Sequence, residues 1–114
     1  MTDYAAVLTS LFPDALWSLS NNDLRTLSWA GSNADPKPSQ ADLDAAWPAV
    51  RDARAWAAVR AERDRLLTAC DWTQVADAPL TADEKQAWAD YRQALRDIPQ
   101  THDDPDDIVW PETP

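Results

Sequence analysis

The chain has 114 residues, of which 20 are Asp or Glu and 10 are Lys or Arg, so that its formal net charge is −10. This length allows one domain with a small core. The acidity disfavours nucleic acid, whose phosphates would be repelled, and an anionic membrane surface. Leu, Ile, Val and Phe make up less than a fifth of the chain, but seven tryptophans supply apolar area. We therefore expect a thin, ordered structure in which tryptophan replaces aliphatic bulk.

A short helix is expected from Asp3 to Phe12, because apolar residues recur three and four positions apart and Pro13 follows. Residues 16–19 and 24–29 instead alternate with a period of two around the turn sequence Asn21-Asn22-Asp23. This pattern predicts a two-stranded hairpin. A lone hairpin is marginally stable, so it must pack on a helix or pair with another chain.

Residues 30–38 read as a loop, and Ser39 is a candidate N-cap for a long helical segment that ends near Cys70. Pro48 removes one backbone donor, so we expect a kink or a restart there. A narrow apolar stripe follows, formed by Trp56, Val59, Leu66 and Cys70. It predicts packing on the hairpin and the last helix of the same chain. The alternative is packing on another copy of the chain, which would make a homo-oligomer through the long helix.

The sequence Thr81-Ala82-Asp83-Glu84 is a capping box, and it begins a helix over residues 81–98 whose apolar face includes Trp88 and Tyr91. Pro99 is expected to stop this helix. The acidic, proline-rich residues 100–114 are expected to be extended unless the apolar residues 108–110 dock on the rest of the chain.

Together these elements predict an α+β fold that is mainly α. Residues 1–99 form a single small domain, with a helix plus hairpin over 1–38, a long helical segment over 39–72 and a C-terminal helix over 81–98. Residues 100–114 form an extended acidic tail.

The sequence offers no catalytic set. His102 is the single histidine, Cys70 is the single cysteine, and one glycine cannot build a phosphate-binding loop. The aspartates of residues 103–107 lack the spacing of a calcium loop, which favours a solvated acidic linker. We expect neither an enzyme nor a cofactor or metal. A lone cysteine fits a reducing cytoplasm, and we expect neither a secretory signal nor a membrane span.

The C-terminal half carries a series of motifs. They are Arg63-Asp64-Arg65-Leu66-Leu67, Asp71-Trp72-Thr73-Gln74, Pro79-Leu80-Thr81, Trp88, Tyr91-Arg92-Gln93-Ala94-Leu95-Arg96-Asp97-Ile98-Pro99 and Trp110-Pro111. In these motifs the chain resembles the phage tail assembly chaperone family, most specifically over residues 71–99. The resemblance implies a helper of tail or tail-fibre assembly in the host bacterial cytoplasm, with no enzyme activity and no cofactor. It implies a phage tail or tail-fibre protein as partner. A permanent adaptor of the virion tail, fibre or baseplate is the alternative.

We expect most of the tryptophans to fill the core, namely Trp17, Trp29, Trp47, Trp56, Trp72 and Trp88. The residues that we place nearest to a partner surface are Trp72, Trp88, Tyr91, Arg92, Arg96 and Trp110, because Trp and Arg are favoured in interfaces. For Trp72 and Trp88 a structural role is slightly preferred, in a buried Trp-Tyr cluster with arginine–aspartate pairs that lock helix to loop. Only Trp110 is expected to face outward.

Overall fold

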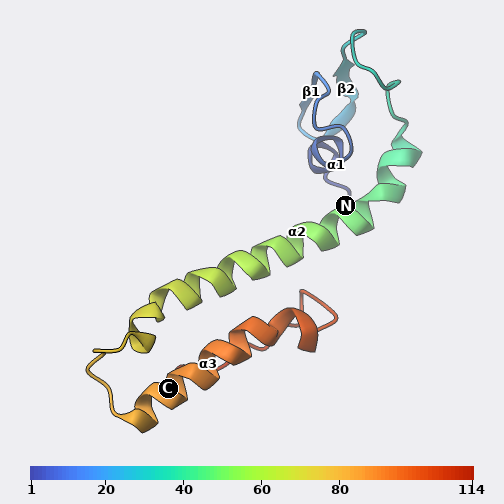
Figure 1. The fold of residues 1–114 in the computed structure, drawn as a ribbon. Helices are drawn as coiled ribbons and strands as arrows, with labels where there is room; N and C mark the ends of the chain where they lie inside the picture. Colours follow the sequence, from blue (N-terminus) through green and yellow to red (C-terminus); the bar gives the residue numbers. More distant parts are fainter. The chain divides into compact units, whose positions relative to one another are not determined.

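The computed structural model describes residues 1–114, which form two compact units, 1–53 and 54–114. In chain order the elements are α1 (Tyr4–Leu11), β1 (Trp17–Ser20), β2 (Asp23–Trp29), α2 (Gln40–Ala69), the 3-10 helix η1 (Asp71–Gln74) and α3 (Ala82–Thr101) (Figure 1). The predicted α+β, mainly α class is confirmed. The division between the units lies within α2 rather than at residue 99, because each half of the chain builds its own hydrophobic cluster.

The hairpin turns at Asn21 and Asn22, whose φ angles of 53° and 58° place both in the left-handed region. A two-residue turn of this kind matches the right-handed twist of the strands, and asparagine tolerates it better than most residues. The Asn22 side chain also accepts a hydrogen bond from the Tyr4 amide at 2.9 Å and donates to the Thr2 carbonyl at 2.8 Å. The turn therefore anchors the start of α1.

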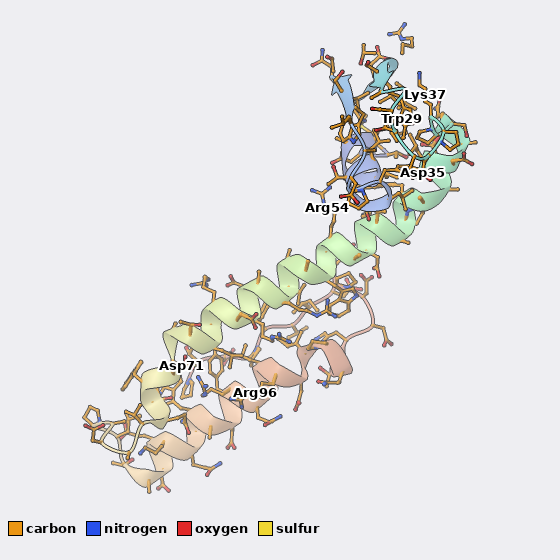
Figure 2. All side chains as sticks on the ribbon, turned by 45° about the horizontal axis from the view of Figure 1, so that its top comes forward. Trp29, Asp35, Lys37, Arg54, Asp71 and Arg96 are labelled. Carbon is orange, nitrogen blue, oxygen red and sulfur yellow. The ribbon has the colours of Figure 1, made fainter.

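Strands β1 and β2 are antiparallel, with Trp17 opposite Trp29, and the register shifts close to the turn. The loop after β2 folds back along this strand, as Figure 2 shows for the labelled Trp29, Asp35 and Lys37. The Trp29 indole donates to the Asp35 carbonyl at 3.0 Å, and the Lys37 ammonium donates to the Leu27 carbonyl at 3.3 Å. The loop thereby covers part of the outer edge of β2.

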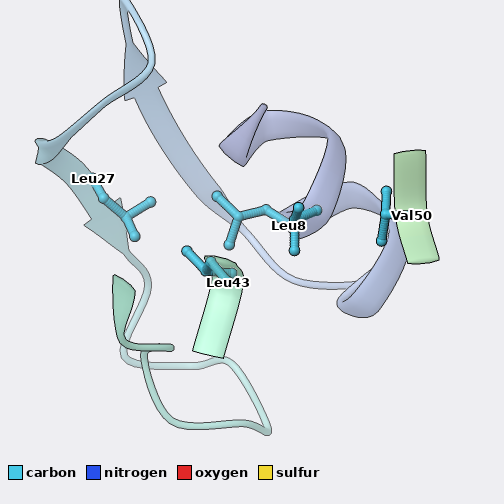
Figure 3. Close-up of a cluster of buried hydrophobic side chains, with 5 residues drawn as sticks. Leu8, Leu27, Leu43 and Val50 are labelled. Carbon is cyan, nitrogen blue, oxygen red and sulfur yellow. The ribbon is translucent and has the colours of Figure 1, made fainter. Parts of the chain in front are cut away.

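The first unit is held by one cluster of buried aliphatic side chains (Figure 3). Its members are Val7, Leu8, Leu27, Leu43 and Val50. Three tryptophans, Trp17, Trp29 and Trp47, are only partly buried and pack around it. The expectation that tryptophan fills the core is therefore corrected here: small aliphatic residues occupy the centre, and the wide indoles cover its rim.

Helix α2 begins after Ser39, whose hydroxyl accepts a hydrogen bond from the Asp42 amide at 3.2 Å. It continues through Pro48 without a break, so the restart that we considered does not occur. Figure 1 shows the ribbon of α2 bending in its teal-to-green section, in the first unit. A bend is the usual consequence of an internal proline. None of the helices combines the length and apolar character needed to span a membrane.

The second unit has its own cluster, in which the α2 stripe packs on α3. The buried members are Val59, Cys70, Tyr91, Leu95 and Ile98, and Trp56, Leu66, Leu67, Trp88, Ile108 and Trp110 pack around them. The apolar stripe of α2 is therefore covered within its own chain in this unit. Its tryptophans again lie at the rim and not in the centre.

Helix α3 starts with the predicted capping box. The Glu84 amide donates to the Thr81 hydroxyl at 3.1 Å, and the Thr81 amide donates to the Glu84 carboxylate at 3.0 Å. The helix does not stop at Pro99, as we expected, but continues to Thr101. Pro99 is tolerated in this last turn, where the Thr101 hydroxyl donates to the Asp97 carbonyl at 3.1 Å.

The tail is docked. Ile108 and Trp110 pack against the second cluster, and the Val109 amide donates to Nε2 of His102 at 3.3 Å. Nδ1 of the same ring lies 3.1 Å from the Ile98 carbonyl, which assigns the ring proton to Nδ1. His102 thus joins the end of α3 to the tail. Residues 100–114 are part of the second unit and not a separate appendage.

Candidate partner-binding surface

Arg92 holds three segments of the second unit together. Its side chain is only 11% exposed, and its Nη1 donates to the Leu67 carbonyl at 2.9 Å and to the Cys70 sulfur at 3.2 Å. Its Nη2 lies 2.9 Å from the Asp71 carboxylate. The Leu67 carbonyl belongs to the last turn of α2, where it also accepts a hydrogen bond from the Cys70 backbone amide at 3.2 Å. Arg92 is therefore a structural clamp, the arginine–aspartate lock that the sequence suggested.

The connection between α2 and α3 is fixed by further hydrogen bonds. Thr73 is fully buried, and its hydroxyl donates to the Cys70 carbonyl at 2.6 Å. The Lys85 ammonium donates to the Val75 carbonyl at 2.9 Å, and the side-chain amide of Gln74 donates to the Lys85 carbonyl at 3.2 Å. The last residue of η1 and the residue that follows it are thus tied to Lys85 in α3. A side chain carried by η1 has a defined position.

Three aromatic rings form a row across this connection. Trp72 and Trp88 lie 6.4 Å apart between ring centroids, and Trp88 and Tyr91 meet edge to face at 5.7 Å. Exposure increases along the row: Tyr91 is buried, Trp88 is half-buried, and Trp72 is 47% exposed. Burial raises the pKa of the Tyr91 phenol above its ordinary value. The row therefore connects the exposed Trp72 ring, through Trp88, to the buried Tyr91 ring.

Arg96 and Trp110 are placed differently from each other. Arg96 is exposed on α3 (Figure 2), two turns beyond Trp88 in sequence. Trp110 was expected to face outward, but it is half-buried against the second cluster. The reason is that Ile108 and Trp110 lie two residues apart in an extended segment, so both side chains reach the same surface. Val109 between them is 76% exposed.

Of the six residues named from sequence, the structure brings Trp72, Trp88, Tyr91 and Arg92 together around the connection. Sequence reasoning missed Val75, which is 48% exposed one turn after Trp72. The available signal was an apolar residue in a short polar connector with no helical or strand periodicity to bury it. We call Trp72, Val75 and the Trp88 ring behind them the connector surface.

The chain assembles no group of three or more His, Cys, Asp or Glu side chains with metal-binding geometry. The acidic stretch forms a turn, in which the Asp106 amide donates to the Asp104 carboxylate at 2.9 Å. His102 and Cys70 have structural contacts, with the tail and with Arg92 respectively. His102 and Cys70 thus take part in fixing the ends of α3 and α2.

Comparison with known proteins gives one family. No curated protein and no solved structure matches the chain. The sequence pattern of the family described as phage tail assembly chaperone protein matches residues 56–114, which nearly coincides with the second unit at 54–114. The match includes the Arg92 clamp, the connector surface and the docked tail. It covers more than half of the chain, which therefore belongs to the phage tail assembly chaperone protein family.

Proposed function

We propose that this chaperone binds a phage tail or tail-fibre protein during folding or assembly in the host bacterial cytoplasm, and that it does so without catalysis or a cofactor. The connector surface is the proposed contact. The observation that carries the proposal is that Trp72 is 47% exposed although it stands on a connection fixed by several hydrogen bonds, one of them made by the buried Thr73. Its position in the part that matches the family supports the same assignment.

Rigid aromatic side chains suit this role. A large indole gives much apolar contact area, and little conformational entropy is lost when a side chain of fixed position meets its partner. Tail subunits that are still folding expose apolar surface and unpaired strand edges, which such a contact can cover. The net charge of −10 keeps the chaperone soluble and opposes its self-association.

The test is co-expression of the chain with the tail or tail-fibre protein encoded beside it, with the soluble fraction of that protein as the readout. We expect the soluble fraction to fall when the chaperone is omitted. Trp72→Ser should reproduce this loss, and Val109→Ser, which changes a 76% exposed residue away from the connector surface, should not. If the soluble fraction is the same with and without the wild-type chaperone, the proposed function fails. If Trp72→Ser is as active as the wild type, the function stands but the connector surface is not the contact.

The alternative of a permanent virion adaptor predicts a different outcome. Mass spectrometry of purified virions would then find the chain in stoichiometric amount with the tail proteins. We expect it to be absent from them, since an assembly helper leaves its client when assembly is complete.

A further inference from the structure

The hairpin of the first unit has two outer edges, and only one is covered. The loop after β2 places the Lys37 ammonium on the Leu27 carbonyl, which satisfies an acceptor on the outer edge of β2. At β1 the Ala30 amide donates to the Leu16 carbonyl at 3.1 Å, so the backbone of Leu16 faces β2. Because backbone direction alternates along a strand, the amide and carbonyl groups of Trp17 and Leu19 face away from β2. They form an open edge.

A hollow lies at each end of β1. One, of about 270 Å³, is lined by residues 11–16 and 32–35, and the other, of about 350 Å³, is lined by Met1, Thr2, Asp3, Ala5, Leu19 and Asn22. The first volume is slightly below the roughly 300–1,000 Å³ typical of ligand pockets, and the second is near the lower end of that range. Each therefore suits single side chains better than a whole small molecule. Apolar groups are exposed at the first hollow, where Leu11 is 46% and Leu16 is 65% exposed.

We propose that β1 binds an extended segment of the tail protein by strand addition. The segment pairs with the backbone of Trp17 and Leu19 and places one apolar side chain in the hollow at either end of the strand. Main-chain hydrogen bonds supply affinity in this binding mode, and pockets for alternate side chains supply specificity. The identity of the partner rests on the proposed function. The strand-addition mode rests instead on the open edge of β1 and the two hollows.

The acidic side chains at the two hollows determine which kind of segment can bind to β1. Asp14 and Asp35 line the first hollow, and Asp3 lines the second. A second copy of the chain, paired through its own β1, would bring the same carboxylates to the same edge, and like charges placed opposite each other are unfavourable. The fitting segment is therefore apolar with neutral or basic flanks. It belongs to another protein.

This surface is distinct from the part that the family pattern matches, because all of its residues precede position 56. The connector surface and the β1 edge would then offer the client two different contacts, one made by aromatic side chains and one by backbone groups. Each can be removed without changing the other.

The experiment compares Leu19→Pro with Leu19→Ala in binding to the tail or tail-fibre protein encoded beside the chain. Both variants lose the leucine side chain, but only proline also removes the outward amide, and proline is tolerated in edge strands at such positions. We expect Leu19→Pro to bind about tenfold more weakly than Leu19→Ala, the effect of about one backbone hydrogen bond. Equal affinities of the two variants, both folded by circular dichroism, would overturn the proposal.

Hydrogen–deuterium exchange of the wild-type chain tests the same edge without a substitution. The amides of Trp17 and Leu19 should exchange rapidly in the free chain and slowly in the complex, and unchanged exchange would contradict strand addition. Sedimentation of the free chain is the control for pairing between two copies. If the wild-type chain forms a dimer and Leu19→Pro dissociates it, the β1 edge binds a second copy of the chain. This result would overturn the proposal that the edge binds the tail protein. A wild-type chain that does not bind the tail protein at all defeats the proposed function, whereas binding with unprotected amides defeats only this inference.

Discussion

Arg92 and Asp71 form an ion pair, with 2.9 Å between Nη2 and Oδ1, that joins the middle of α3 to the start of η1. The two partners differ in solvent exposure, since the arginine side chain is 11% exposed and the aspartate side chain is 62% exposed. The pair is therefore half solvated. The other nitrogen of Arg92, Nη1, donates to the Leu67 carbonyl at the end of α2 and to the Cys70 sulfur, both in the less exposed part of the contact.

Arg92→Ala should destabilise the second unit by about 1–3 kcal/mol, because it removes the hydrogen bonds to the Leu67 carbonyl and the Cys70 sulfur together with the packing of a largely buried side chain. Asp71→Asn should cost less than about 1 kcal/mol, as is usual for an exposed partner. Urea unfolding measures both. Equal effects of the two substitutions would show that the ion pair, and not the helix-end hydrogen bond, carries the stabilisation.

Leu95→Ala and Leu8→Ala test the division into two units. Each residue is fully buried, Leu95 in the second cluster and Leu8 in the first. Each substitution should cost about 2–5 kcal/mol within its own unit, through the lost transfer free energy and the cavity left behind. Hydrogen exchange resolved by peptide should therefore accelerate mainly in residues 54–114 for Leu95→Ala and mainly in residues 1–53 for Leu8→Ala. A uniform acceleration in both variants would mean that the units unfold as one.

The capping box makes the start of α3 sensitive to acid. Hydrogen bonds from the Thr81 amide and hydroxyl lower the pKa of Glu84 below its ordinary value. A lowered pKa in the folded state means that the charged form stabilises the helix at neutral pH, and this contribution is lost as the pH falls through that pKa. Glu84→Gln keeps a hydrogen-bonding side chain but does not titrate. The wild type should therefore melt at a higher temperature than Glu84→Gln at pH 7, and the difference should shrink as the pH is lowered below the ordinary pKa of a glutamate and through the lowered pKa of Glu84.

Trp110→Ala should release the tail, because Trp110 and Ile108 are the apolar contacts that hold it on the second cluster. The Val109 amide, which donates to His102 in the docked tail, should then exchange faster with solvent. Val109→Ala is the matched control, since this side chain is 76% exposed and its loss should leave the tail in place. Unchanged exchange in Trp110→Ala would mean that the acidic turn before it is sufficient to fix the tail.

Local signals in the sequence predicted the elements well. The Asn21-Asn22 turn, the Ser39 cap and the Thr81–Glu84 capping box all occur where they were expected, because each depends on backbone groups only a few residues away. The α2 stripe was predicted to pack on the hairpin and on the last helix. It packs on α3, whereas the hairpin cluster takes Leu43 and Val50 from the earlier part of α2. These features are set by hydrogen bonds and periodicity within one element or between neighbours in the sequence.

Features that depend on distant contacts were not predictable in this way. The docking of Trp110 depends on the second cluster, whose members come from α2 and α3. The continuation of α3 past Pro99 was missed for another reason: proline was taken as a stop, although it is accommodated here in the last turn of the helix. At the candidate surface the sequence identified Trp72 and Trp88 but could not tell which of them is exposed. That difference arises because η1 carries Trp72 on the outside of the connection, while Trp88 is covered by its neighbours.

The placement of the tryptophans at the rims of both clusters has a practical consequence. Indoles that are partly covered respond to small changes in local polarity, so the fluorescence of this chain should report on both units without an added dye. Trp72 and Trp88, whose rings lie 6.4 Å apart, are also close enough for their electronic transitions to couple. A near-ultraviolet circular dichroism band from this pair would change when a client covers Trp72, which gives a label-free signal for encounter and release.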